Sequence, residues 1–243
     1  MNRLSAAAAA AAFAATASAV AVPRAAAAPG GTAVYFARGR DASLFDQFDV
    51  DGYSLQAFPE RSGVRLVVKA SGSRPASRAP RAAELAGPAP APSAERDRVA
   101  GELAGGKRLQ RDAVRAILDW IRTSIVYDPD RGLPQDPAAV FVSRRAYCVG
   151  FAELAVDLLR RAGIPAATVQ GVLVTEASAP GYSPELSGVY HRWVQVFYPD
   201  TGWTFEDPLA TRGGIDARYV AFARRSWTRP GDLRLDVLSA EPR

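Results

Sequence analysis

Two stretches in the second half of the chain carry apolar residues at helical spacing. In residues 109–124 these apolar side chains mark one buried stripe. In residues 151–162 they follow i, i+3, i+4, i+7, i+8 and i+11, and charged side chains occupy the other face. Gly163 and Pro165 end this second stretch. The pattern predicts two amphipathic helices, with Cys148 at or near the N-terminus of the second.

Shorter stretches rich in β-branched and aromatic residues predict β-strands in both halves of the chain. They are residues 32–38, 52–58, 64–70, 166–174, 190–198 and 203–207. PERSG separates the second stretch from the third, and PDTG separates the last two. Both are turn sequences, so each of these pairs is predicted to form a hairpin.

The composition changes sharply between the two halves. Residues 72–95 are rich in Pro, Ala, Ser and Arg and predict a linker between a β-rich segment, 29–71, and a larger domain, 96–243. The β-rich segment has too few strands to bury much surface alone, so we expect it to pack on the larger domain. A long polar stretch, residues 175–189, either lines or covers a site or is disordered.

The N-terminus has the features of a secretory signal peptide, assigned to residues 1–28. A basic end at Arg3 precedes an alanine-rich run without charge up to Arg24, and Ala17-Ser18-Ala19 offers a small-residue cleavage pattern. The alternative is an uncleaved anchor, although the weakly apolar run is only marginally long enough to span a bilayer. We expect a secreted or periplasmic protein with no stable membrane span after signal cleavage.

Charge and composition exclude several classes of partner. The net charge is +5, but the Arg residues are scattered, and no basic face with interleaved aromatic residues indicates a nucleic-acid partner. Such a surface suits acidic polymers of a cell envelope. One His and one Cys cannot supply a usual zinc site, and no acidic loop has the ligand spacing of a calcium site. We therefore expect no metal.

Cys148 is the only cysteine, so it cannot form a disulfide within the chain. Three interpretations are open: a small buried hydrophobic residue, an intermolecular disulfide, or a reactive thiol. The free N–H groups and positive dipole at a helix N-terminus lower a cysteine pKa from about 8.5 towards about 7. Gly150, which is costly inside a helix, leaves one side of this terminus open to close approach. The position favours a reactive thiol.

His191, the only histidine, opens the predicted hairpin of residues 190–207, and Asp207 closes it. Cross-strand neighbours in an antiparallel pair share a face. A three-residue loop pairing Tyr198 with Gly202 would place His191 and Asp207 on one face, on a diagonal. A four-residue loop would place them on opposite faces. We therefore predict an odd-length loop or a one-residue bulge, for which Gly202 is suitable.

The order of these segments resembles the transglutaminase-like superfamily. The segments are YCVGFAELAVDLLRRAGIPA, then a strand, then HRWVQVFYPDTGW and DP, and the resemblance covers roughly residues 108–210. It implies an α+β fold with a papain-like core, in which the nucleophile helix packs on an antiparallel sheet. By the same resemblance Cys148 is the nucleophile, His191 the general base and acid, and Asp207 the residue that orients the imidazole. No soluble cofactor is implied.

The chain departs from the pattern of the superfamily at one position and leaves another role unassigned. Many relatives have Gly two residues before the cysteine, where this chain has Ala146. The Cys148 N–H is the natural first donor to an oxyanion by analogy. No residue stands out as the second donor, and Gln135 and Tyr127 are the candidates.

The resemblance implies an exported cysteine enzyme that forms a thioester with a glutamine or a peptide-like amide. The acyl group then passes to an amine or to water. The expected partners are protein or peptide substrates, which include peptides of the cell envelope. One alternative is a cysteine peptidase or amidase acting on protein or on peptidoglycan peptides. Another is a noncatalytic peptide-binding module, since the superfamily includes inactive members.

Overall fold

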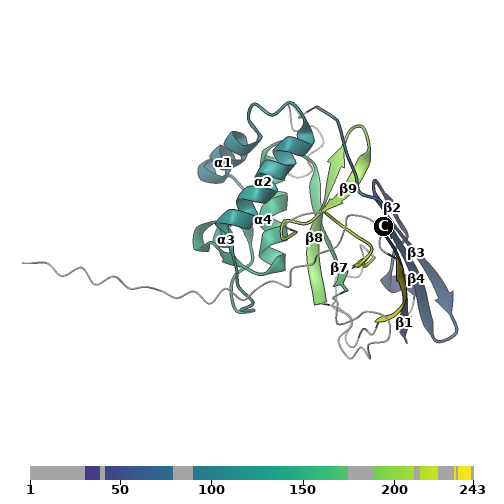
Figure 1. Ribbon diagram of the computed structural model, residues 1–243. Coiled ribbons are helices and arrows are strands. Elements are labelled where there is room, and N and C mark those ends of the chain that lie inside the picture. The colour runs from purple at the N-terminus through teal and green to yellow at the C-terminus, as the bar shows by residue number, and fades with distance from the viewer. Residues whose placement is uncertain are drawn as a thin grey trace, which may run out of the picture.

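The protein has an α+β fold of three layers, as the resemblance implied (Figure 1). A layer of helices covers one face of a four-stranded sheet, and a five-stranded sheet covers the other face. The structure is a computed structural model, and the residues it describes are 31–38, 42–78, 90–174, 189–210, 214–223, 233 and 235–241.

The five-stranded outer sheet joins segments from both ends of the chain. Its strand order is β11-β1-β4-β3-β2, and every neighbouring pair is antiparallel. The strands are β1 (Gly31–Arg38), β2 (Phe48–Val50), β3 (Tyr53–Glu60), β4 (Gly63–Ala70) and β11 (Leu235–Glu241). The sequence placed β11 with the domain of residues 96–243. It pairs instead with β1, whose edge would otherwise be unpaired.

The four-stranded inner sheet has the order β10-β7-β8-β9 and is also antiparallel. Its strands are β7 (Ala166–Leu173), β8 (Val189–Tyr198), β9 (Gly202–Glu206) and β10 (Tyr219–Ala221). A separate parallel pair, β5 (Val126–Tyr127) with β6 (Arg145–Ala146), lies between helices in the sequence.

The helices are α1 (Ala94–Ala104), α2 (Gln110–Ser124), α3 (Pro137–Ser143) and α4 (Cys148–Arg161), with a 3-10 turn, η1, at Ala42–Leu44. The apolar stripes correctly predicted α2 and α4. α1 was missed because it buries only Val99 and Ala100 and begins inside the predicted linker. α3 was missed because it is short, although Asp136 caps it and accepts the Ala139 N–H at 3.0 Å.

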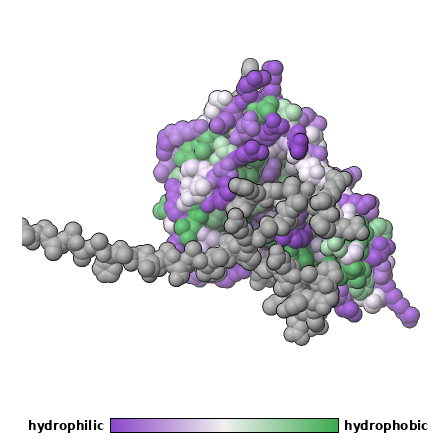
Figure 2. Space-filling model, viewed as in Figure 1, coloured by the Kyte–Doolittle hydropathy of each residue, from purple (hydrophilic) through white to green (hydrophobic). Residues whose placement is uncertain are grey.

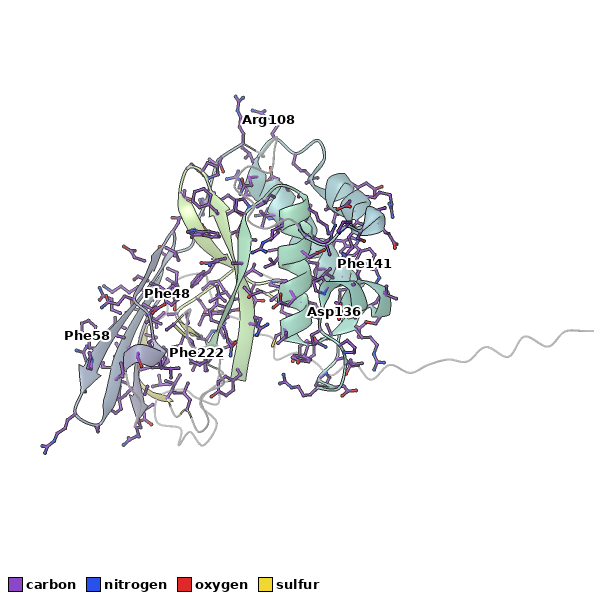
Figure 3. All side chains as sticks on the ribbon, turned by 180° about the vertical axis from the view of Figure 1, so that it is seen from behind. Phe48, Phe58, Arg108, Asp136, Phe141 and Phe222 are labelled. Carbon is purple, nitrogen blue, oxygen red and sulfur yellow. The ribbon has the colours of Figure 1, made fainter. Side chains whose placement is uncertain are left out.

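The inner sheet separates two hydrophobic cores because successive side chains of a strand point to opposite faces. Trp193 belongs to the core shared with the outer sheet, whereas Val194 belongs to the core shared with the helices. Figure 3 shows Phe48 and Phe222 between the two sheets and Phe141 among the helices. The N-terminal strands therefore pack on the later domain, as predicted.

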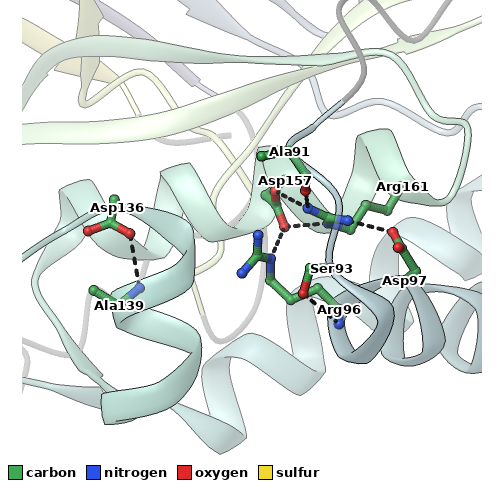
Figure 4. A network of polar contacts seen from close by, with 8 residues as sticks. All are labelled: Ala91, Ser93, Arg96, Asp97, Asp136, Ala139, Asp157 and Arg161. Atoms are coloured by element: carbon green, nitrogen blue, oxygen red, sulfur yellow. Dashed lines mark hydrogen bonds and ion pairs between the residues drawn. The ribbon is translucent and has the colours of Figure 1, made fainter.

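A buried ion-pair network attaches α1 to α4 (Figure 4). The Asp157 carboxylate accepts from Arg96 Nε at 3.0 Å and from Arg161 Nε at 2.8 Å, and Arg161 also reaches Asp97. The Arg161 side chain is 2% exposed. Removing one partner of such a pair leaves a buried charge and costs about 3–5 kcal/mol. The network accounts for a helix that apolar spacing alone did not predict.

Several predictions concern segments outside the described residues. They include the signal peptide of residues 1–28 and nearly all of the polar stretch 175–189. On the face shown in Figure 2, hydrophilic residues are spread over the helical layer and the outer sheet, among scattered hydrophobic ones. In the described part of the chain, no helix is long and apolar enough to cross a bilayer.

Candidate active site

Cys148 is the first residue of α4, and its side chain is 7% exposed. The first turn of α4 contains no carboxylate, and the N-cap residue Tyr147 makes no side-chain capping bond. Among the described residues, no oxygen accepts the N–H of Cys148. The sulfur therefore lies at the positive end of the helix dipole, beside an amide that is free to donate, and both features favour a thiolate.

Gln135 anchors the N-terminus of α4. Its Oε1 accepts from the backbone N–H of Tyr147 at 3.1 Å and of Gly150 at 3.0 Å, while its Nε2 donates to the Leu133 carbonyl at 3.0 Å. A Cβ at position 150 would lie 2.6 Å from that oxygen, so Gly150 is what allows the close approach. Gln135 was a candidate second oxyanion donor. Its role in the structure is to position the helix, because Oε1 holds the first turn of α4 and one N–H of Nε2 is used by the Leu133 carbonyl.

The β8–β9 hairpin brings His191 and Asp207 to one end of the inner sheet. Tyr198 pairs with Gly202, whose φ is +83°, so the loop has three residues and the predicted odd length is confirmed. β9 ends at Glu206, opposite Val194, and Asp207 follows one step beyond. His191 therefore lies diagonally from Asp207, on the same face of the sheet.

The imidazole and the carboxylate of this hairpin are in direct contact. His191 Nε2 lies 2.8 Å from Asp207 Oδ2, and both side chains are buried. Burial lowers the pKa of His191, but the charge of Asp207, its hydrogen bond and the nearby Cys148 outweigh this and raise the pKa to about 10. Burial raises the pKa of Asp207, but His191 and hydrogen bonds from Leu209 and Tyr219 hold it below its usual value. The directions of these two pKa shifts favour a protonated His191 paired with an ionised Asp207.

The thiol of Cys148 lies near the imidazole of His191, and hydrogen bonding and charge between the two groups act on the pKa of each. Because His191 Nε2 contacts Asp207, Nδ1 is the ring nitrogen left for the sulfur. Burial raises the pKa of Cys148, but the hydrogen bond and charge of His191, together with the Arg192 backbone N–H, lower it below its usual value. The three residues named from the sequence thus come together as a thiol, an imidazole and a carboxylate in series. This arrangement can hold a thiolate–imidazolium pair.

Three further side chains contact or influence this series. Tyr219 of β10 donates its hydroxyl to Asp207 Oδ2 at 2.8 Å. The guanidinium of Arg131 lies 4.4 Å from the Tyr147 ring, and its charge adds to the lowering of the Cys148 pKa. Burial, and then the charge of Cys148, raise the pKa of Tyr127. Tyr219 and Arg131 were missed because neither lies in a recognisable motif.

A concave region lies away from Cys148, His191 and Asp207. It has a volume of about 530 Å³ and lies between β2 and the turn before β9, with Asp49, Asp51 and Trp203 among its lining residues. In the described ranges, no group of three or more His, Cys, Asp or Glu residues could hold a metal ion.

Known proteins resemble the chain in sequence and in fold. The model of the transglutaminase-like superfamily matches residues 97–208. The uncharacterized protein YebA of Bacillus subtilis is 32% identical over an alignment of 110 residues, and the match covers 39% of this chain and 15% of YebA. A cysteine protease candidate from Cytophaga hutchinsonii has a TM-score of 0.46 at 15% identity, covering 87% of both chains. The periplasmic domain of TgpA from Pseudomonas aeruginosa has a TM-score of 0.42 at 16% identity, covering 75% of this chain and 88% of that one.

Proposed function

We propose that the protein is a cysteine acyl-transfer enzyme of the transglutaminase-like superfamily, whose model matches residues 97–208. Its substrate would be the side-chain amide of glutamine or a peptide-like amide. The observation that carries the proposal is the series of contacts from Cys148 through His191 to Asp207. A thiol held only for packing would not require a buried imidazole backed by a buried carboxylate.

The first half of the proposed reaction forms a thioester. The Cys148 thiolate attacks the amide carbon, and a C–S bond forms as the carbonyl becomes an oxyanion. His191 then donates its Nδ1 proton to the amide nitrogen, and the C–N bond breaks to release ammonia or an amine. Asp207 keeps the imidazole in the orientation that presents Nδ1 to the sulfur.

The second half of the proposed reaction regenerates the thiolate. An amine or a water molecule loses a proton to His191 Nδ1 and attacks the thioester carbon. The C–S bond breaks, and the product is a new amide or a carboxylic acid. Exclusion of water from the site would favour the amide.

The oxyanion needs hydrogen-bond donors in both halves. The Cys148 N–H is the proposed first donor, since no described oxygen accepts it. The Tyr127 hydroxyl is the proposed second donor, because the charge at Cys148 acts on it and its ring lies 6.3 Å from that of Phe151 in α4.

We place the enzyme outside the cytoplasm. The support is the signal-like pattern of residues 1–28, whose sequence has a basic start and an alanine-rich run. Protein or peptide substrates, including peptides of the cell envelope, would then be within its reach. The excess of Arg over acidic residues suits an acidic envelope surface.

The test uses mature protein, a fluorescent primary amine and a casein-like acceptor, with attachment and ammonia release both followed. Wild type should give attachment or ammonia, and Cys148→Ala and His191→Ala should give neither while retaining the wild-type circular dichroism. Peptide cleavage without either product would favour the peptidase or amidase. A Cys148 thiol that does not react faster than a free cysteine, with no product at all, would leave only the binding module.

A further inference from the structure

Tyr219 connects the candidate active site to strand β10. Its hydroxyl donates to Asp207 Oδ2, the oxygen that also faces His191 Nε2. Its ring lies 6.0 Å from the His191 ring and 5.4 Å from the Trp193 ring. Tyr219 lies beyond residue 208, where the match to the superfamily ends. The chain therefore supplies this contact from outside the part that the superfamily describes.

β10 is a three-residue strand, and among the strands that the structure describes it pairs with β7 alone, at the edge of the inner sheet. Such a short edge strand needs other contacts to hold its backbone in place. The outer sheet supplies two of them from buried tyrosines. Tyr53 of β3 donates its hydroxyl to the Tyr219 carbonyl at 2.7 Å, and Tyr35 of β1 donates to the Ala217 carbonyl at 2.8 Å.

Tyr53 also touches the strand that leads into Asp207. Its ring lies 4.9 Å from that of Phe205 in β9, two residues before Asp207. Tyr53 therefore bridges the strand that precedes the carboxylate and the strand that carries the tyrosine bound to it. Tyr35 donates its hydroxyl to the carbonyl of Ala217, two residues before Tyr219 and on the approach to β10.

We propose that the N-terminal sheet is a positioning element of the candidate active site. Tyr53 fixes the backbone of Tyr219, the Tyr219 hydroxyl fixes the Asp207 carboxylate, and the carboxylate holds His191 against Cys148. This proposal rests on the proposed function only where kcat and KM are measured. Alkylation of the Cys148 thiol can be measured without a substrate. Tyr53 and Tyr219 are positioning residues, since neither touches the sulfur.

Loss of either hydroxyl should loosen the series. Without the Tyr219 hydroxyl, Asp207 Oδ2 loses one of its two side-chain partners, and the carboxylate gains freedom to turn away from the imidazole. Without the Tyr53 hydroxyl, the buried Tyr219 carbonyl loses its donor, so the β10 backbone shifts to find another. In both cases the His191 imidazolium is held less firmly beside Cys148, so it stabilises the thiolate less.

The experiment compares Tyr219→Phe, Tyr53→Phe and the matched control Tyr35→Phe with wild type. Each variant removes one buried hydroxyl and no other atom. The readouts are urea unfolding and the pH dependence of Cys148 alkylation by iodoacetamide, followed by kcat and KM on an active substrate. Tyr127 and Arg131, which also act on the thiol, are unchanged in all three variants.

We expect Tyr219→Phe to raise the midpoint of the thiol titration by about one unit, so that alkylation at pH 6 slows about tenfold. Tyr53→Phe should slow it about threefold and lower kcat without changing KM. Tyr35→Phe should lose as much stability as Tyr53→Phe but titrate as wild type. A variant that does not fold in buffer is measured with trimethylamine N-oxide, which favours the folded state.

Two results would overturn the proposal: an unchanged titration in Tyr219→Phe, or identical titrations in Tyr53→Phe and Tyr35→Phe. Both results differ from the result expected if the proposed function is wrong. If the proposed function is wrong, Cys148 of the wild-type protein would itself titrate as a free cysteine.

Discussion

Replacement of Gly150 by alanine tests how the thiol-bearing helix is held. In an open helix this substitution stabilises the protein by up to about 1 kcal/mol, because glycine has the greater backbone freedom in the unfolded chain. At position 150 a Cβ would lie 2.6 Å from Gln135 Oε1, 2.7 Å from Ala146 Cβ and 2.8 Å from Val140 Cγ2. All three contacts are shorter than van der Waals packing allows, so the neighbours must move.

The structure sets the size of the effect. Overpacking of this kind costs about 1–3 kcal/mol. Displacement of Gln135 also weakens the hydrogen bonds from Tyr147 N–H and Gly150 N–H, at about 1 kcal/mol each. After subtraction of the gain in helix propensity of about 1 kcal/mol, we expect Gly150→Ala to destabilise the protein by about 2–4 kcal/mol.

The assay is urea unfolding followed by fluorescence of the four tryptophans, with Gly101→Ala as the matched control. Gly101 lies inside α1, and a Cβ there would meet nothing within 4 Å. The same substitution should therefore stabilise at position 101 and destabilise at position 150. If both variants were stabilised equally, the close approach of Gln135 would play no part in anchoring the helix, and this reasoning would be refuted.

Three further predictions concern the chemistry at the sulfur. Asp207→Asn removes the charge that raises the His191 pKa, so the alkaline limb of the activity profile should move to lower pH and kcat should fall by at least about 10²-fold; an unmoved alkaline limb would contradict this. Arg131→Ala should slow alkylation of Cys148 by anionic iodoacetate about threefold more than by neutral iodoacetamide, because a nearby positive charge attracts the anion; equal slowing with both reagents would remove Arg131 from the site. Tyr127→Phe should lower kcat by about 10²-fold and leave the midpoint of thiol alkylation unchanged, as expected for loss of an oxyanion donor; full activity would exclude that role.

Strong local patterns were enough to predict the elements that carry the thiol and the imidazole. The apolar stripe of residues 151–162 predicted α4, and an odd-length loop or a bulge was predicted from the requirement that His191 and Asp207 share a face. In both cases the periodicity of one continuous segment determines which side chains share a face. The choice of Cys148, His191 and Asp207 as site residues came from the resemblance to the superfamily.

Elements that depend on tertiary contacts were not predicted. α1 has a weak apolar stripe and is attached through the ion pairs of Asp157, which lies 61 residues from Arg96 in the sequence. β11 joins the outer sheet through pairing with β1, at the opposite end of the chain. Sequence patterns of a single segment hold no information about such distant partners.

The supporting residues of the site were missed for the same reason. Tyr219 lies in a three-residue strand without alternation, and its contact with Asp207 depends on how β10 packs. Gln135 was named as a candidate oxyanion donor, and the structure shows its oxygen accepting the backbone N–H groups of Tyr147 and Gly150 at the start of α4. The signal for Gln135 was Gly150, since a glycine inside a helix often marks a close approach of another group.

The most direct test of the account is the thiolate absorbance of Cys148 as a function of pH. The 240 nm signal of wild type minus that of Cys148→Ser reports the thiolate alone, and His191→Ala reports the contribution of the imidazole. We expect a wild-type midpoint below about 8.5, the value of a free cysteine, and a higher midpoint in His191→Ala. A wild-type midpoint at or above about 8.5, unchanged in His191→Ala, would contradict the account.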